Sequence, residues 1–552
     1  MNKEFSPTHS ENLVFIGAGA TAALGMPSTY AQTRIFRNLA ESETDKDIEE
    51  ALSNYFDEPD RSKVLALLKL LDSDNIYSIS PADCRNVKTL YDGKGDEEKQ
   101  KTRILELRHE YDWNAAKKII KLCPEKHDEN TDNLILDAYS IIDKRLISGQ
   151  SLKVYSTNGT TEIILDTSRL QGARNFLILF VNMMFASAWY KITKGEKADD
   201  FSKYQSFINS FDKLMQKEGM LKYQKKCKPE NRDFYLFSTS FVSFNFDMVF
   251  PWIFMTSHHD MNQNPPYIQD HPLKIWLDYG CEHRGRKHDD NNIIIPTLEF
   301  TESVASRENE ESHIGTPFNR AGKFYFAHGS SNWRECPVCG RMTFYFGYSH
   351  NKWKYKSTEL IPPFPFPIFQ ELPENGLTER EKHWRKNLHY DSLQCMHCGS
   401  ETCATDAPMI MQTMYKSTPT SFLEEIQRNV KVAISKAQHI VLLGYSLPTD
   451  DTIWQHAFSE GIRARNSSKE KPFCSVVVGI SDEQRWLKDA ELTAYIDQHK
   501  NKADENLAEY GIPTIENAIA IFGKENVRAW TGGIPQVFGE CTEDDVKRLL
   551  EI

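Results

Sequence analysis

The chain has 552 residues, of which 40% are apolar and 26% charged, a globular composition that excludes disorder throughout. Its formal net charge of −12 creates no overall field that attracts nucleic acid or an anionic membrane, so neither is an expected partner. The N-terminus lacks a signal-peptide pattern, and the chain has eleven cysteines, which favours a reducing, cytoplasmic setting with some thiolates bound to metal. The length allows several domains, or one large α/β domain with insertions.

The first apolar segment runs into a glycine-rich turn. Leu13–Ile16 predicts a short strand, and Gly17-Ala18-Gly19 follows at once. The first glycine allows a sharp turn, and the second lets the backbone approach a pyrophosphate closely. The helix that follows, expected over Thr21–Arg37 with an early break at Pro27, would direct its first amide groups at the anion, and Thr21 can cap it. Tight turns that bind nothing also use glycine, so this pattern alone leaves both interpretations open.

Residues 40–225 predict a mostly helical insertion. Apolar residues recur there at three- and four-residue spacing, as in the leucine-rich stretch from Val64 to Leu71. The apolar window Phe176–Trp189 predicts a buried helix, because fourteen residues rise only about 21 Å and a membrane core needs about 30 Å. The charge-rich segment Asp92–Glu110 favours a solvated face or a loop.

Sequence patterns typical of strands return after the insertion. The last part of the chain alternates between strand and helix patterns. The expected strands are Phe234–Phe244, His439–Leu443, Ser475–Ile480 and Val527–Trp530, and the expected helices are Phe422–Ala437 and Thr493–Glu509. A parallel α/β arrangement follows from this alternation.

Two Cys-x-x-Cys pairs predict a metal site. Cys336-Pro-Val-Cys339 and Cys395-Met-His-Cys398 are each followed by glycine, and 55 residues separate them (395 − 339 − 1). Four thiolates suit tetrahedral zinc, and a site without an open position is structural. Two alternatives are that these are reduced core cysteines, or that Cys403 or His397 replaces one ligand.

Three further segments resemble motifs of the SIR2 (sirtuin-like) family. They are Ser243-Phe244-Asn245-Phe246-Asp247, Ala327-His328-Gly329-Ser330 and Gly444-Tyr445-Ser446-Leu447-Pro448. With the glycine loop and the cysteine pairs they stand in the family's order, over roughly residues 12–490 and the C-terminal strand. The resemblance implies an α/β fold with a doubly wound Rossmann-like parallel sheet, a large helical insertion and a small zinc-binding module.

The resemblance also implies a division of the chain into five parts. They are the start of the Rossmann domain at 12–39, the helical insertion at 40–225, more of the Rossmann core at 226–335, the zinc module at 336–403, and the completion of the Rossmann domain with C-terminal elements at 404–552.

The same resemblance assigns site residues by position. The cofactor-binding set is Gly17, Ala18, Gly19, Ala20 and Thr21 around the pyrophosphate, Asn245 and Asp247 at the nicotinamide ribose, and Gly444 and Ser446 on the adenosine side. The catalytic set is Asn245, His328 and Asp247, and the structural zinc ligands are Cys336, Cys339, Cys395 and Cys398. In this scheme the amide of Asn245 orients a water, Asp247 positions the nicotinamide amide or stabilises developing charge, and His328 accepts a proton near neutral pH.

Several departures separate the chain from the deacylases of this family. Gly25-Met26-Pro27-Ser28 replaces the usual Gly-Ile-Pro-Asp stretch, Phe244 replaces the usual glutamine, and residues 407–411 replace the Val-x-Phe-Gly-Glu segment that holds an acyl-lysine peptide. The chain therefore looks like the divergent SIR2-like proteins of bacterial antiphage defence that hydrolyse NAD+. The expected reaction is cleavage of NAD+ to nicotinamide and ADP-ribose.

Two other functions stay open at this stage. One is an NAD-dependent protein deacylase, and the other is a non-catalytic sensor of NAD or ADP-ribose. Because an uncontrolled NADase harms its host, the resemblance also implies gating, by homo-oligomerisation or by a partner such as an ATPase, an Argonaute-like protein or a phage component. Residues 40–225 are the expected interface.

Overall fold

The structure is a computed structural model. It describes residues 11–58, 60–73, 76–91, 97–124, 134–155, 162–195, 197–224, 239–263, 267–268, 271–272, 284–288, 324–348, 379, 393–395, 397–403, 406–410, 420–448, 451–465, 471–479, 484–500, 507 and 510–551.

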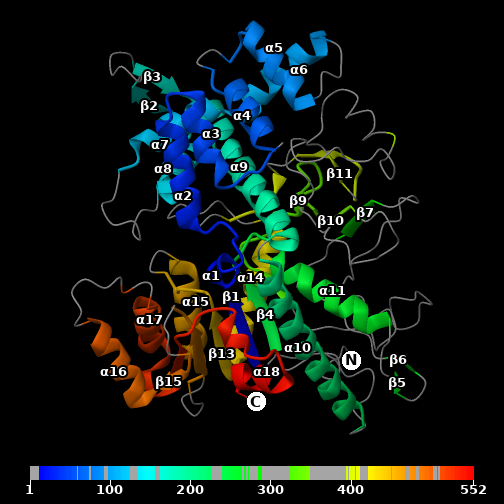
Figure 1. The fold of residues 1–552 in the computed structure, drawn as a ribbon, viewed down its shortest axis with the longest axis vertical. Coiled ribbons are helices and arrows are strands. Elements are labelled where there is room, and N and C mark those ends of the chain that lie inside the picture. The colour runs from blue at the N-terminus through cyan, green and yellow to red at the C-terminus, as the bar shows by residue number, and fades with distance from the viewer. Residues whose placement is uncertain are drawn as a thin grey trace.

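A seven-stranded, mostly parallel sheet forms the base of the fold (Figure 1). In spatial order its strands are β15 (Trp486–Lys488), β16 (Val527–Trp530), β14 (Phe473–Val477), β13 (His439–Leu443), β1 (Asn12–Ile16), β4 (Thr239–Ser243) and β8 (Phe324–Phe326). Within this sheet only β15 runs antiparallel to its neighbour. Strands β1, β4 and β13 are buried along their whole length. The apolar runs of β1 and β13 predict this, whereas β4 also buries Thr239, Ser240 and Ser243.

The strand order reverses beside β1. The chain adds β4 and β8 on one side of this strand and β13, β14 and β16 on the other. In register, Ile16 lies between Ser243 and Leu443, so the segments that follow these three residues leave the sheet at the same edge. This arrangement brings together residues from distant parts of the sequence.

Helices pack around the sheet and continue the alternation of the C-terminal part. They are α1 (Gly19–Ala22), α11 (Val249–Gln263), α14 (Ser421–Lys436), α15 (Thr452–Arg463), α16 (Asp489–Lys500), α17 (Ile512–Phe522) and α18 (Glu543–Leu550), with short 3-10 turns at Lys524–Asn526 and Gln536–Phe538. The hydroxyl of Thr420 caps α14 by accepting from the amide of Leu423.

A helical layer gathers at the other end of the molecule (Figure 1). It contains α2 (Thr29–Glu41), α3 (Asp45–Ser53), α4 (Asp60–Leu71), α5 (Pro81–Tyr91), α6 (Glu97–Glu110), α7 (Trp113–Leu122), α8 (Leu134–Ser148) and α9 (Thr167–Lys194), and a hairpin of β2 (Leu152–Tyr155) and β3 (Glu162–Leu165). The long helix α9 leads back towards the sheet, where α10 (Ala198–Gln224) packs on α11 and α18. The expected helical character of residues 40–225 is confirmed in the described parts, and the expected boundary at residue 40 falls within the last turn of α2.

Short strands surround the cysteine pairs. They are β9 (Trp333–Glu335) and β10 (Met342–Tyr348) with β7 (Arg284–His288), and the hairpin of β11 (Leu393–Gln394) and β12 (Glu401–Thr402). A separate pair is β5 (Tyr267–Ile268) with β6 (His271–Pro272).

Most expected elements are present, with shifted ends. The strands at 439–443 and 527–530 and the helix at 421–436 match closely, whereas the strand expected at 475–480 begins at Phe473, and the helix expected from Thr493 begins at Asp489. The expected strand Phe234–Phe244 is described only from residue 239. Among the described residues, no helix combines the length and apolar character needed to cross a membrane.

The expected break of the first helix near Pro27 is confirmed, and only the expected outer ends differ. The chain forms α1 and α2, because it turns at Gly25 and α2 starts where the hydroxyl of Ser28 caps it by accepting from the amide of Ala31. The expectation for the charge-rich segment ending at Glu110, a solvated face or a loop, is confirmed in part. Residues 97–110 form α6, which has an exposed charged face but also buries Arg103 and Arg108.

Candidate functional site

A cavity of about 460 Å³ lies at the carboxyl ends of β1, β4 and β13, a volume in the range of small-molecule sites. Its lining contains Gly17, Ala18, Gly19 and Thr21 after β1, Asn245 and Asp247 after β4, and Gly444 and Ser446 after β13. Eight of the nine residues that the sequence assigned to cofactor binding therefore meet around one cavity. The ninth, Ala20, is fully buried beside it, and its carbonyl accepts a hydrogen bond from Tyr204 at 2.6 Å.

The glycine loop packs against the turn after β13. The amide of Gly17 donates to the carbonyl of Leu443, and the amide of Gly19 donates to the carbonyl of Gly444, both at 3.0 Å. A Cβ atom on Gly17 would lie 2.5 Å from the Gly444 oxygen, and one on Gly444, which has a φ of 63°, would lie 2.1 Å from the Ala20 nitrogen. Glycine is thus required at Gly17 and Gly444 for contact between two loops, as well as for any contact with a ligand.

The Asn-x-Asp segment ties the turn after β4 to the glycine loop. The amide nitrogen of Asn245 donates to the carbonyl of Gly17 at 3.0 Å and to the hydroxyl of Thr21 at 3.1 Å. That hydroxyl donates to a carboxyl oxygen of Asp247 at 2.9 Å, and the other carboxyl oxygen accepts from the amide of Val249 at 3.0 Å. The network fixes the floor of the cavity before any ligand enters.

Burial raises the pKa of Asp247 to about 6, although hydrogen bonds from Val249, Thr21 and Asn245 oppose the rise. The side chain is 4% exposed, and no cation among the described residues contributes to the shift of its pKa. Near neutral pH the floor of the cavity therefore carries a negative charge that its surroundings disfavour, and a cationic group on a ligand would relieve this.

The expected capping role of Thr21 was wrong. Helix α1 begins at Gly19 after Ala18, which offers no side-chain cap, and the Thr21 hydroxyl donates to Asp247 instead. Helix α1 also has only four residues, so it directs few amide groups at the cavity. The residue belongs to the cavity all the same, through its contact with the Asn-x-Asp segment.

The structure places His328 behind the cavity and not in its lining. The side chain is 1% exposed, its ring centroid lies 4.8 Å from that of Phe244, and its Nε2 accepts a hydrogen bond from the indole of Trp454 at 3.1 Å. Phe244 lines the cavity and also packs against the tilted ring of Tyr445, at 4.4 Å between centroids. Neutral His328 therefore carries its proton on Nδ1, and Nε2 can accept another proton only after the contact with Trp454 is broken.

The segment Ala407–Ile410 packs against His328. The amide of Ile410 donates to the carbonyl of His328 at 2.9 Å. The same segment runs so close to Gly329, which has a φ of 83°, that a Cβ atom there would lie 1.6 Å from the Pro408 oxygen. The close approach of the Pro408 carbonyl therefore explains why a glycine follows His328.

Several cavity residues carried no sequence signal. Leu136 of α8 and Phe185 of α9 come from the helical insertion and close the cavity on the side away from the sheet. Both belong to ordinary apolar helix patterns, which predict burial but not a ligand. The helical insertion therefore completes the cavity.

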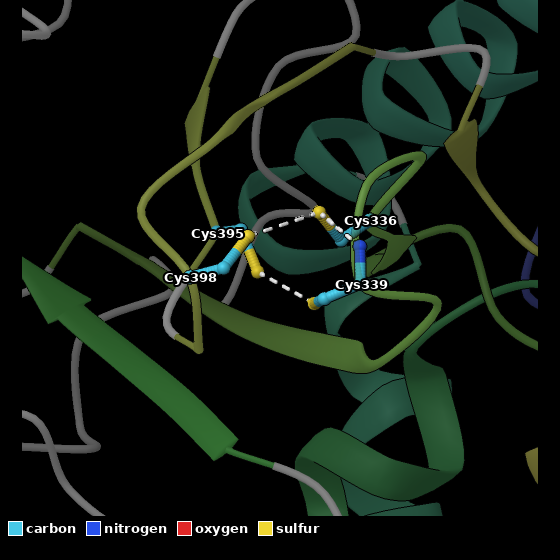
Figure 2. Close-up of side chains that lie close together, drawn as sticks. All are labelled: Cys336, Cys339, Cys395 and Cys398. Atoms are coloured by element: carbon cyan, nitrogen blue, oxygen red, sulfur yellow. Dashed lines mark hydrogen bonds between the residues drawn. The ribbon is translucent and has the colours of Figure 1, made fainter.

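The two Cys-x-x-Cys pairs meet as predicted (Figure 2). The sulfur atoms of Cys336, Cys339, Cys395 and Cys398 all lie within 4.8 Å of one another. Cys336 and Cys398 are 3.5 Å apart and Cys339 and Cys395 are 3.8 Å apart, close to the sulfur–sulfur distance of about 3.8 Å that tetrahedral zinc requires. This four-cysteine cluster can hold a metal such as zinc, and within the described part of the chain neither Cys403 nor His397 joins it.

Both pairs form the same turn. The amides of Gly340 and Gly399 donate to the carbonyls of Cys336 and Cys395 at 2.8 and 2.9 Å, and both glycines have positive φ. Amides of the turns also point at sulfur, from Cys339 to Cys336 at 3.5 Å and from His397 to Cys395 at 3.4 Å. Such contacts stabilise thiolates, which are the form that binds metal.

A scan against protein-family models finds no match for this chain, and a search of curated proteins finds none.

Proposed function

We propose that this chain is a SIR2-like NAD+ glycohydrolase that binds NAD+ in the cavity at the ends of β1, β4 and β13. The observation that carries the proposal is the convergence of three motifs, from distant parts of the chain, on one cavity. The strand order from β8 to β16 supports it, because in chain order the parallel strands read 3-2-1-4-5-6, the order of a doubly wound dinucleotide-binding sheet. Such sheets bind ligands where the order reverses, here beside β1.

The proposed reaction breaks the bond between C1′ of the ribose and the nicotinamide nitrogen. The bonding electrons go to that nitrogen, so nicotinamide leaves neutral, and positive charge develops on the ribose. A water oxygen then bonds to C1′ and loses a proton, giving ADP-ribose. Asp247 stabilises the cationic ring and the developing charge, and the amide oxygen of Asn245 orients the water.

His328 is the proposed proton acceptor, and its surroundings support a gated enzyme. The Nε2 atom of His328 accepts a hydrogen bond from Trp454. Phe244, which lines the cavity, packs against the His328 ring. We infer that full activity requires a rearrangement, driven by a homo-oligomer or a regulatory partner, as in an antiphage-defence effector. The same observation favours a second candidate, a non-catalytic sensor that binds NAD or ADP-ribose without turnover.

The deciding experiment measures NAD+ consumption by the purified protein, alone and with an acyl-lysine peptide, as nicotinamide and ADP-ribose released. Hydrolysis without peptide that is lost in Asn245→Ala and His328→Ala supports the NADase. Turnover only with peptide supports a deacylase. Binding without turnover, in every assembly state tested, supports the sensor. A wild-type protein that neither binds nor cleaves NAD+ would overturn the proposal.

The four-cysteine cluster is proposed to hold structural zinc, with Cys336, Cys339, Cys395 and Cys398 as thiolate ligands. A bound zinc ion would join two segments that are 55 residues apart. All four ligand positions come from the protein, so the metal takes no part in the proposed reaction.

A further inference from the structure

Helix α2 contributes polar side chains to the cavity that is proposed to bind NAD+. Pro27, Thr29 and Gln32 line this cavity at the start of the helix. Thr29 and Gln32 are three residues apart, so they share the face of α2 that is turned towards the cavity. The other lining residues from the helical layer, Leu136 and Phe185, are apolar. Among the described lining residues, polar side-chain contacts from this layer to a ligand therefore come from Thr29 and Gln32.

The side-chain amide of Gln32 is held in one orientation. Its Nε2 donates to the carbonyl of Pro27 at 3.2 Å. A carbonyl can only accept a hydrogen bond, so this contact fixes which end of the amide is the NH2 group. The other end, Oε1, accepts no hydrogen bond from the described residues, although the residue is only 8% exposed. Oε1 is not fully enclosed, and because Gln32 lines the cavity, this free acceptor is within reach of a ligand there.

The turn before α2 places Gln32 on the Asp247 side of the cavity. The amide of Met26 donates to the carbonyl of Thr21 at 3.2 Å, and the hydroxyl of Thr21 donates to Asp247 at 2.9 Å. The carbonyl that holds Gln32 belongs to Pro27, the residue directly after Met26. Since Asp247 is proposed to stand at the nicotinamide end of NAD+, Gln32 is expected to meet the same end.

The nicotinamide end offers a donor that matches this acceptor. The ring carries a carboxamide, whose NH2 group needs an acceptor. Both carboxyl oxygens of Asp247 already accept hydrogen bonds, one from Thr21 and the other from Val249. Oε1 of Gln32 can accept from the NH2 group without giving up any contact in the described part of the chain.

We propose that Gln32 is a specificity-determining residue of the NAD+ site, and that its Oε1 accepts a hydrogen bond from the carboxamide NH2 group of the nicotinamide ring. This inference rests on the proposed function. The carbonyl of Pro27 is then a positioning group, because it holds the amide of Gln32 by its other end. ADP-ribose lacks the carboxamide, so this contact favours the intact dinucleotide over the product of its hydrolysis.

The test measures the affinity of the full-length protein for two ligands by calorimetry. One is a carbocyclic NAD+ analogue whose nicotinamide bond does not hydrolyse. The other is the same analogue with an acetyl group in place of the carboxamide, so that a methyl group replaces NH2. The wild type is expected to bind the carboxamide form about three- to tenfold more tightly, the value of one hydrogen bond. Gln32→Met keeps the length of the side chain but removes Oε1, and it should bind both forms equally well.

The matched control is Gln455→Met. The amide of Gln455 donates to the carbonyl of Pro448 at 2.9 Å, and Pro448 lines the cavity as Pro27 does. Gln455 itself is not among the described lining residues. Both variants lose a contact that holds a cavity loop, so both should lower the unfolding temperature. Only Gln32→Met should lose the preference for the carboxamide form.

Three results would overturn the inference and leave the proposed function standing. The first is equal affinity of the wild type for the two analogues, which needs no variant. The second is an equal loss for both analogues in Gln32→Met with the preference intact, which would assign its Oε1 to a ribose hydroxyl or its role to the loop. The third is the same loss of preference in Gln455→Met. If the wild type binds neither analogue, the inference and the proposed function both fail.

Discussion

In the candidate site, burial changes the ionisation of Asp247. Burial raises its pKa to about 6 in the folded protein, against an ordinary value of 3.8. Between these two values the folded state holds the proton more tightly than the unfolded state, so stability falls as the pH rises from about 4 to about 6. Above that range the full cost is present, at most about 3 kcal/mol.

Asp247→Asn should therefore stabilise the protein near neutral pH. The gain in unfolding temperature over the wild type should be near zero at about pH 4 and reach its maximum at about pH 7, because only the wild type ionises. Thermal unfolding followed by circular dichroism across this range checks it. A gain that is the same at every pH would show that the charge of Asp247 is not its source.

Gly444 should be among the least replaceable residues of the site. Gly444→Ala places a Cβ atom 2.1 Å from the Ala20 nitrogen, in a backbone with a φ of 63°. Gly149 has the same φ but nothing within 4 Å of its Cβ position, so Gly149→Ala isolates the backbone strain. We expect about 1–2 kcal/mol for Gly149→Ala and roughly 2 kcal/mol more for Gly444→Ala, measured by urea unfolding. Equal losses would show that the two loops are not in firm contact.

The residues of the site that could be predicted are those with unusual local chemistry. A glycine pair after a strand, an Asn-x-Asp triplet and a Gly-x-Ser turn are visible in sequence, and the structure brings them together. Trp454 and Phe185 could not be predicted as site residues, because a buried aromatic on a helix has the same pattern whether it borders a ligand or the core. The withdrawal of His328 behind Phe244 also depends on tertiary packing alone.

At the scale of elements, the second cysteine pair lies in the turn of a very short hairpin. The hairpin of β11 and β12 has only two residues in each strand. Strands this short do not hold a hairpin without further support, so the metal is expected to supply it.

Removal of the metal should therefore loosen this module. The protein is expected to bind one zinc ion, measured by mass spectrometry of the metal content, and to lose it together with several degrees of thermal stability in Cys395→Ser. Cys403→Ser is the matched control, because Cys403 lies outside the cluster. Zinc loss in the control as well would restore Cys403 as a ligand.

Helix α6 has a solvated face, as the charge density predicted, but it also buries arginines that the sequence did not reveal. Arg108 is 2% exposed, and its guanidinium donates to Asp83 at 2.6 Å, to the carbonyl of Leu70 at 2.7 Å and to the carbonyl of Ser78. The local sequence pattern cannot distinguish an exposed arginine from a buried one that joins three segments. The partners of Arg108 lie 25 to 38 residues away in the sequence.

Arg108→Met should destabilise the protein by about 3–5 kcal/mol, because it leaves Asp83 buried without its cation. Arg61→Met is the control: its ion pair with Glu58 is solvent-exposed, and its loss should cost at most about 1 kcal/mol. Chemical denaturation measures both. A double variant, Arg108→Met with Asp83→Leu, should recover part of the loss, and failure to do so would assign the effect to the backbone carbonyls instead.

At the scale of the whole molecule, the sequence predicted a parallel α/β sheet and a mostly helical insertion, because both have distinct periodicities over long segments. The place where the insertion meets the sheet was beyond prediction, since it depends on contacts such as Leu136 and Phe185 at the cavity. A ligand in that cavity should hold the two parts together.

ADP-ribose at 100 times its dissociation constant is thus expected to stabilise the whole chain by about 2.7 kcal/mol, in one cooperative transition. Differential scanning calorimetry of the wild type measures this, with Gly444→Ala as the variant that should lose the effect. Two separate transitions, only one of which shifts, would show that the ligand contacts the sheet alone.

The pairing of β1 with β13 has a consequence for synthesis on the ribosome. Strand β1 begins at Asn12 and its partner at His439, so the central pair cannot form until 427 further residues have been translated (439 − 12). At bacterial or eukaryotic speeds this takes roughly 20 to 90 s. The turn at Gly444, which completes the cavity, emerges later still. A nascent chain therefore has no finished cavity until Gly444 has been translated, and the order of the strands would delay the proposed NAD+ hydrolysis until then.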